Sequence, residues 1–139
     1  MQDSNDNVWL LCYGDFYQSG EAAIFKISNQ TQAIEKKIDI AEGFPSELVY
    51  SQREDALFYL NNDLFKLELD ATTEPTRAHI RASGRTIYGV TIDEPRNELY
   101  LADAINFTER GFVYRYSMSG VVVDTIPAGI VPNAVFPAF

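Results

Sequence analysis

The 139-residue sequence predicts an all-β fold built from repeated antiparallel sheets of four short strands each. The first observation is a triplet of an aromatic, a basic and an apolar residue that occurs three times, at 25–27, 65–67 and 114–116, with spacings of 40 and 49 residues. The second is that each triplet lies between two further short runs of β-branched or aromatic residues, which are typical of strands. Four such strands in roughly forty residues is the size of one β-propeller blade. The sequence therefore predicts about three blades, which form an incomplete ring.

The third repeat, residues 93–136, shows the four strands most clearly. Each is a short apolar run bounded by turn residues, and the run at 113–116 alternates large and polar side chains as a half-covered strand does. We expect its strands at Leu99–Leu101, Val113–Tyr116, Val121–Ile126 and Asn133–Phe136, with Pro127 and Gly129 in the turn before the last strand.

The first and second repeats, residues 8–50 and 51–92, follow the same order. Each repeat begins at the second strand of one blade and ends with the innermost strand of the next. Residues 1–7 are polar and are expected to be a flexible lead-in, and 1–139 is interpreted as a single domain. The expected strands are Val8–Leu11, Phe25–Ile27, Ile34–Ile40 and Leu48–Tyr50, then Leu57–Leu60, Phe65–Leu67, Arg77–Ile80 and Ile87–Ile92.

Composition and charge limit the possible partners. A content of 46% hydrophobic and 13% aromatic residues is enough for a packed core. The net charge of −9 opposes binding to a phosphate backbone, so nucleic acid is not expected as a partner. Cys12 is the one cysteine and is interpreted as a small core residue. No apolar run approaches the ~18 residues that a membrane-spanning helix needs, and the first seven residues are too polar for a signal peptide.

The loops with unusual residues are expected to share one end of the blades, because antiparallel strands alternate their connections between two ends. The loop 13–20 carries three aromatic rings, which either bind a ligand or pack over the neighbouring blade. Asp15, Glu47, Arg85, Glu109 and Asn133 are expected at this end, and Thr31, Arg53, Thr73, Arg96 and Ser119 in plain turns at the other. The predicted ligand-binding residues are Tyr13, Phe16, Tyr17, Phe44, Asn62, Tyr88, Asn106, Phe107 and Arg110.

Catalytic and metal-binding patterns are weak. His79 is the one histidine, and it is expected at a solvent-exposed edge in an outer strand, so a histidine triad or a multi-histidine metal site cannot form within this chain. Asp103 and Glu109 lack the regular spacing of a calcium loop, and Asp103 is interpreted as a strand-end cap. The sequence predicts no catalytic residue, no metal site and no cofactor.

Several segments resemble a known family. Leu99–Asp103, Gly111–Tyr116, Gly120–Thr125 and Gly129–Asn133 look like the last blade of the YncE-like seven-bladed propellers, which are surface lipoproteins of Bacteroidetes. Val8–Leu11 and its aromatic loop are similar to earlier repeats of that family. The resemblance covers nearly the whole chain, which would correspond to a three-repeat, C-terminal part. Ligand contacts vary between members, so no binding residue carries over to a numbered position.

The resemblance implies a non-enzymatic ligand-binding propeller of the bacterial cell envelope, at the outer-membrane surface or in the periplasm. Some members capture cobalamin and pass it to an outer-membrane transporter, so a small molecule or glycan, cobalamin among them, is the expected ligand. The alternatives are a propeller enzyme of the lyase or lactonase type, completed by other blades, and a protein-interaction scaffold. The remaining blades are expected from a longer chain or from a second copy.

Overall fold

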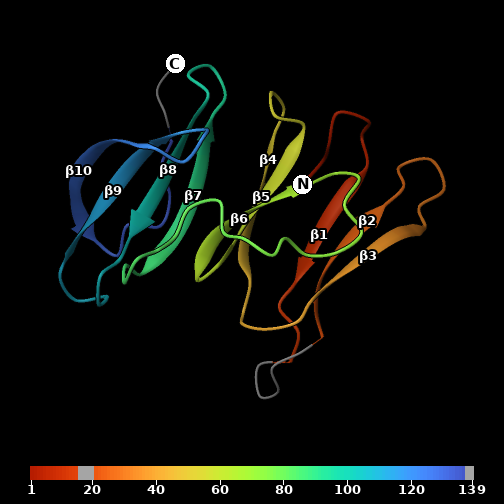
Figure 1. Cartoon of the computed structure of the whole chain (residues 1–139), viewed down its shortest axis with the longest axis horizontal. Coiled ribbons are helices and arrows are strands. Elements are labelled where there is room, and N and C mark those ends of the chain that lie inside the picture. The colour runs from red at the N-terminus through yellow and green to blue at the C-terminus, as the bar shows by residue number, and fades with distance from the viewer. Residues whose placement is uncertain (16–20, 137–139) are drawn as a thin grey trace.

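The computed structural model describes residues 1–15 and 21–136 (Figure 1). Within these residues it contains strands and no helix, which confirms the all-β fold class. The strands are β1 (Val8–Cys12), β2 (Ala22–Ile27), β3 (Ile34–Ile40), β4 (Ser46–Ser51), β5 (Ala56–Asn61), β6 (Asp63–Glu68), β7 (Ile87–Asp93), β8 (Glu98–Asp103), β9 (Arg110–Ser117) and β10 (Val122–Ile130).

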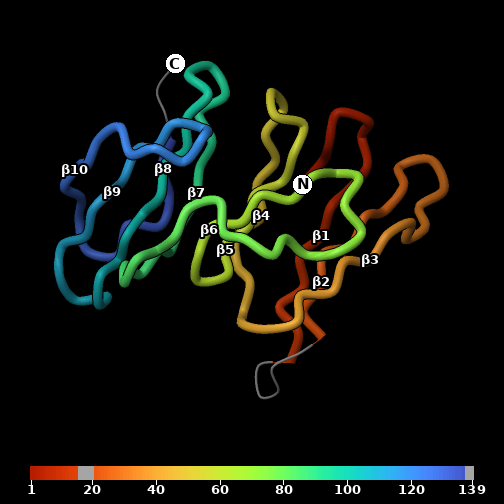
Figure 2. The backbone as a smooth tube through the Cα atoms, in the orientation of Figure 1, coloured from red at the N-terminus to blue at the C-terminus, as the bar shows by residue number. Residues whose placement is uncertain are grey.

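The strands form three antiparallel sheets, with the orders β1-β2-β3, β4-β5-β6 and β7-β8-β9-β10. The sheets lie one after another in chain order in an open arrangement (Figure 2). As predicted, the last strand of a repeat belongs to the next sheet, because β4 pairs with β5 and β7 pairs with β8. The description as propeller blades in an incomplete ring is therefore confirmed.

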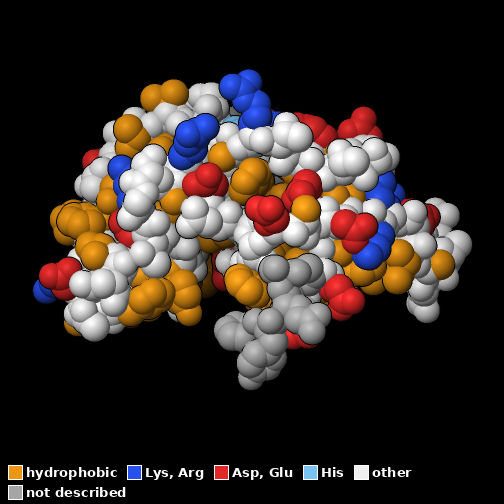
Figure 3. Space-filling view, turned by 60° about the horizontal axis from the view of Figure 1, so that its bottom comes forward, with side chains coloured by type: hydrophobic (Ala, Val, Ile, Leu, Met, Phe, Trp, Pro, Cys, Tyr) orange, Lys and Arg blue, Asp and Glu red, His pale blue; other side chains and the backbone are white. Residues whose placement is uncertain are grey.

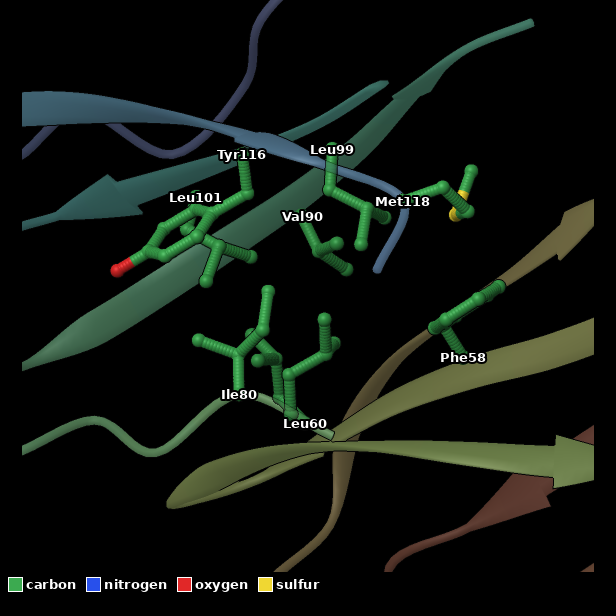
Figure 4. Packing of buried hydrophobic residues seen from close by; sticks show 9 residues of the cluster. Phe58, Leu60, Ile80, Val90, Leu99, Leu101, Tyr116 and Met118 are labelled. Carbon is green, nitrogen blue, oxygen red and sulfur yellow. The ribbon is translucent and has the colours of Figure 1, made fainter. Parts of the chain in front are cut away.

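The core consists of two apolar layers, one between each pair of neighbouring sheets. Strand β5 contributes to both, since Leu57 and Tyr59 pack toward the first sheet while Phe58 and Leu60 pack toward the third. This is why the run from 57 to 60 is apolar without alternation: a central strand covered on both faces buries every side chain. The layer between the second and third sheets also contains Ile80, Val90, Leu99, Leu101, Tyr116 and Met118 (Figure 4).

The basic residue of each repeated triplet forms an ion pair within its sheet. These side chains are between 24% and 31% exposed, so their aliphatic stems are largely covered while the charges meet an acidic neighbour. The pairs are Lys26 with Glu35 at 3.1 Å, Lys66 with Glu54 at 3.2 Å, and Arg115 with Glu98 at 3.0 Å.

The N-terminal segment is folded, so the expectation of a flexible lead-in at residues 1–7 is wrong. The Asp3 side chain is buried and accepts hydrogen bonds from the backbone N–H groups of Asn5 and Asn7 and from the indole N–H of Trp9. The backbone N–H of Trp9 donates to the Met1 carbonyl, and Gln2 forms a β-bridge with Val8. The Asn7 side-chain amide is a fourth donor to the Asp3 carboxylate, and these hydrogen bonds order a polar segment whose composition alone predicts flexibility.

Two expected strands are absent from the described residues. Of 77–80, only Ile80 pairs, through one bridge to Leu64. This outermost segment follows Pro75 and is rich in polar residues, so a full strand there would bury little. Residues 133–136 form no strand, because they pair with none of the described strands.

The turn expected at Pro127 and Gly129 is also wrong, because both residues lie within β10. Strand β10 is at the edge of its sheet, where a proline that lacks an N–H is tolerated. The chain then crosses back over the third sheet. A β-carbon on Gly89 would lie 2.1 Å from the Asn133 carbonyl oxygen, and one on Gly111 would lie 2.9 Å from the Pro132 ring. These two glycines make room for the crossing.

Candidate ligand-binding face

A hollow of about 380 Å³ lies where strands β4 and β7 begin, and we call these two the inner strands. We call the end of the sheets that contains it the loop end; its described connections are 13–15, 41–45, 62, 104–109 and 131–133. The hollow receives Tyr13 after β1, Glu47 at the start of β4 and Tyr88 at the start of β7, so all three sheets contribute. Its remaining lining consists of Ser46, Asn133 and Ala134. Figure 3, in which the lower side of Figure 1 is turned forward, shows acidic and hydrophobic side chains next to one another on the surface.

Two β-bulges place side chains at this hollow. In β4 the pairing steps from Ser46 with Leu60 to Leu48 with Tyr59, which leaves Glu47 as an extra, unpaired residue. Strand β7 has a register shift at the corresponding point, and the extra residue there is Tyr88. A bulge turns a side chain away from the regular alternation of a strand. The two inner strands therefore present Glu47 and Tyr88 to the same hollow by the same device.

Glu47 has a strained backbone. Its φ of 50° lies in the left-handed region, which costs a residue with a β-carbon about 1–2 kcal/mol. Pro45, two residues earlier, is buried and restricts the chain that enters the bulge. The surrounding structure thus holds an exposed carboxylate in an unfavourable conformation at the hollow.

The Tyr88 ring packs against the Phe107 ring. The sequence predicted only that these two residues lie at the same end of the sheets. Their centroids are 5.3 Å apart at an interplanar angle of 89°, the edge-to-face geometry that aromatic pairs favour. Both side chains remain about half exposed, at 46% and 47%. Tyr13 is 62% exposed at the hollow, so rings at positions 13 and 88 both have accessible surface there.

Several other predicted binding residues have partners in their own surroundings. The Asn106 side-chain oxygen accepts from the N–H groups of Thr108 and Glu109, and its amide donates to the Glu109 carboxylate at 2.9 Å. The Arg110 Nε donates to the Ala128 carbonyl at 3.4 Å. Neither side chain lines the hollow, and their roles in binding remain predictions.

The remaining predicted residues lie around the loop end or outside the description. Asn62 is exposed in the tight β5–β6 turn with a φ of 64°, and Phe44 is 53% exposed before β4. Phe16 and Tyr17 fall outside the described residues. Arg85 points into the protein, where Nη1 donates to the Tyr116 hydroxyl at 2.7 Å and the guanidinium lies over the Tyr114 ring at 4.0 Å.

Asp103 caps the end of β8, as the sequence predicts. Its Oδ1 accepts hydrogen bonds from the N–H groups of Thr86 at 3.0 Å and Ile105 at 2.9 Å. The side chain is buried and ties the long loop 104–109 to the entry of β7. Burial raises the pKa of the neighbouring Tyr114 hydroxyl, which lies 3.4 Å from Asp103 Oδ2. Asp103 is therefore part of the support for the loop end.

A second hollow, of about 510 Å³, lies at the opposite end, where the sequence predicted only plain turns. Glu54, Lys66, His79 and Arg96 contribute to it, between the second and third sheets. The expectation that His79 is a solvent-exposed edge residue is wrong. Its Nε2 lies 2.7 Å from the Met118 carbonyl oxygen, and its ring packs edge-on to the buried Phe58 at 5.4 Å. Because 77–80 is not a regular strand, His79 can turn toward the third sheet.

The described residues contain neither a metal-binding cluster nor a membrane-spanning helix. No group of three or more histidine, cysteine, aspartate or glutamate side chains in this part of the chain is placed to hold a metal ion. Within the same residues there is no helix that is long and apolar enough to span a membrane.

Comparison with known proteins supports the fold and does not indicate a specific function. No family model matches the sequence, and no curated protein does. Among solved structures, the chain is similar to a quinoprotein alcohol dehydrogenase-like protein from Bacteroides thetaiotaomicron, with a TM-score of 0.68 and 21% identity over 89% of this chain. The chain spans 32% of the length of that protein. The similarity supports a propeller-like fold.

Proposed function

We propose that this chain is the ligand-binding part of a non-enzymatic β-propeller, and that a small molecule binds at the loop-end hollow. One observation carries the proposal: three sheets deliver Tyr13, Glu47 and Tyr88 to one hollow where the inner strands begin. Concave sites that combine aromatic surface with a few polar groups are typical of small-molecule binding. The loop-end hollow has this composition.

The finer form of the proposal is a flat or ring-shaped ligand, such as a corrinoid (cobalamin) or a glycan, bound at the bacterial cell envelope and passed to an outer-membrane transporter. It is supported by the resemblance to surface propellers of Bacteroidetes and by the accessible rings of Tyr13 and Tyr88, which can stack on such a ligand. The serine hydroxyl and asparagine amide of the hollow can bind its polar edge.

Calorimetry tests the proposal with a panel that contains cobalamin, cobinamide and glycans. Changing Tyr13 and Tyr88 together to alanine should weaken binding of any ligand found by tenfold or more, roughly the loss of one well-packed anchor. Tyr100→Ala, in the middle of β8 and outside the hollow, is the aromatic control and should leave the affinity unchanged. Equal affinities for the parent and the double variant, with circular dichroism showing both folded, would exclude this hollow as the site.

We also propose that further blades, from a longer chain or a second copy, cover the outer faces of the first and third sheets. Leu10 and Ile34 on the first sheet are 47% and 63% exposed, and Ile126 on the third is 41% exposed. Exposed apolar sheet faces favour association. The 139-residue chain should therefore associate in light scattering, and replacing Leu10 and Ile34 with glutamine should reduce this. A monodisperse monomer at high concentration would contradict the proposal.

A further inference from the structure

We infer that the loop-end hollow selects a ligand that carries an organic cation, such as a primary amine or a quaternary ammonium group. The inference rests on the proposed function and specifies the chemistry of the same site. It follows from the sign of the charge in the lining, from the aromatic rings beside that charge and from the bulges that present both.

The charge in the hollow is negative. Among the described residues, Glu47 is the one charged residue in the lining, and it forms no ion pair with a described lysine or arginine. The two arginines expected at the loop end are engaged elsewhere: Arg85 with the Tyr116 hydroxyl and the Tyr114 ring, and Arg110 with the Ala128 carbonyl. A carboxylate without a cationic neighbour attracts a positively charged ligand and repels an anion.

The rings in the hollow suit a cation as well. Tyr13 and Tyr88 are both tyrosines with accessible surface, and the face of an aromatic ring attracts an ammonium group through its quadrupole. The edge-to-face contact with Phe107 limits the movement of the Tyr88 ring. Two tyrosine rings and one carboxylate line the hollow, and these are the kinds of group with which aromatic cages bind ammonium ligands.

The backbone itself determines where Glu47 and Tyr88 lie, because both are bulge residues. Glu47 and Tyr88 are the extra residues at corresponding points of β4 and β7, and Glu47 is held in the left-handed region, with a φ of 50°. Strain of this kind persists where the surrounding structure imposes it. The net charge of −9 also raises the concentration of cations near the surface.

The test compares two probes of the same shape. Choline carries a quaternary ammonium group, and 3,3-dimethylbutan-1-ol is its neutral isostere. Titration of the 139-residue chain, followed by NMR chemical shifts, should show choline binding at least tenfold more tightly than the isostere, with shifts at residues 13, 47 and 88. Choline affinity should fall as salt is added.

The matched variants are Glu47→Gln and Glu109→Gln, which remove the same charge inside and outside the hollow. Only Glu47→Gln should weaken choline binding, by about tenfold. Equal binding of the two probes, equal effects of the two variants, or no choline binding by the folded chain would each overturn the inference. In these cases the proposed function still stands if the Tyr13 and Tyr88 double variant loses affinity for a neutral ligand of the panel. If no ligand depends on those rings, the proposed function fails too.

Discussion

The two ends of the sheets use the same strands for different tasks. At the loop end, Tyr13 and Phe107 are exposed in connections and Tyr88 at a bulge of β7, and Glu47 has no ion-pair partner among the described residues. At the opposite end, which we call the turn end (3–7, 28–33, 51–55, 93–97 and 117–121), short turns are fixed by their own side chains.

The turn end repeats one solution in all three sheets. A buried polar side chain stands at the start of the turn and accepts backbone N–H groups two to four residues later: Asp3 from Asn5 and Asn7, Ser51 from Glu54, and Asp93 from Arg96. Such bonds replace the hydrogen bonds that a turn leaves unmade. The comparison teaches that the turn end supports stability, whereas the loop end leaves polar and aromatic groups available for a ligand.

The largest expected effect is at the turn end. Asp93 is fully buried, and it accepts from the Arg96 N–H at 3.1 Å and from the Arg96 guanidinium at 2.7 Å. Asp93→Ala should lower the free energy of unfolding by about 2–3 kcal/mol, because the turn loses a buried, charged acceptor of two hydrogen bonds from Arg96. Urea denaturation measures this. Glu109→Ala in a loop-end connection should change it by less than about 0.5 kcal/mol; equal losses for the two variants would contradict the division between the ends.

The pH dependence of stability sharpens the same comparison. Burial raises the pKa of Asp93, but the hydrogen bonds from Arg96 outweigh it, so the pKa lies below its usual value. Likewise, burial raises the pKa of Asp3, and the bonds from Trp9 and Asn7 lower it further than burial raises it. A lowered pKa in the folded state stabilises the fold above the unfolded pKa of about 3.9, and this contribution is lost as the pH falls through the folded value.

The double variant Asp3→Asn, Asp93→Asn tests that dependence. It should be less stable than the parent at pH 7 and should approach the parent as the pH is lowered from about 5 to 2, since the parent alone loses carboxylate bonds there. Thermal melting across this range measures the difference. A constant gap between the two proteins at all pH values would show that these carboxyls do not titrate with unfolding.

Much of the fold could be predicted from the sequence because its signals are local. The unbroken apolar run at 57–60 reflects a strand covered on both faces, and each repeated triplet lies within a strand, in β2, β6 and β9. The errors arose where stability depends on neighbours that the sequence does not show. Residues 133–136 have strand-like composition but no pairing strand, and Asp3 orders residues 1–7 through Trp9.

The candidate site was only partly predictable for a related reason. The sequence predicted that Tyr13 and Tyr88 lie at the same end, because strand alternation determines which connections meet. It could not reveal that Glu47 is a bulge residue, since a bulge depends on the register with β5. Nor could it show that Asn106 bonds within its own loop while Arg85 points into the core.

The smallest expected effect concerns the strain at Glu47. Glycine adopts a φ of 50° without a steric penalty, so Glu47→Gly relieves about 1–2 kcal/mol and loses about 0.5–1 kcal/mol through the greater freedom of the unfolded chain. The net gain in the free energy of unfolding should therefore lie between about 0 and 1.5 kcal/mol, measured by urea denaturation. Glu47→Ala, which keeps the β-carbon, is the control and should stay within about 0.5 kcal/mol of the parent. Both variants should weaken choline binding by about tenfold, as expected for Glu47→Gln, because neither has the carboxylate. A glycine variant that is less stable than the alanine variant would show that the bulge is not strained. If Glu47→Gly is more stable than the parent but binds choline more weakly, the backbone conformation at Glu47 lowers stability in favour of ligand binding.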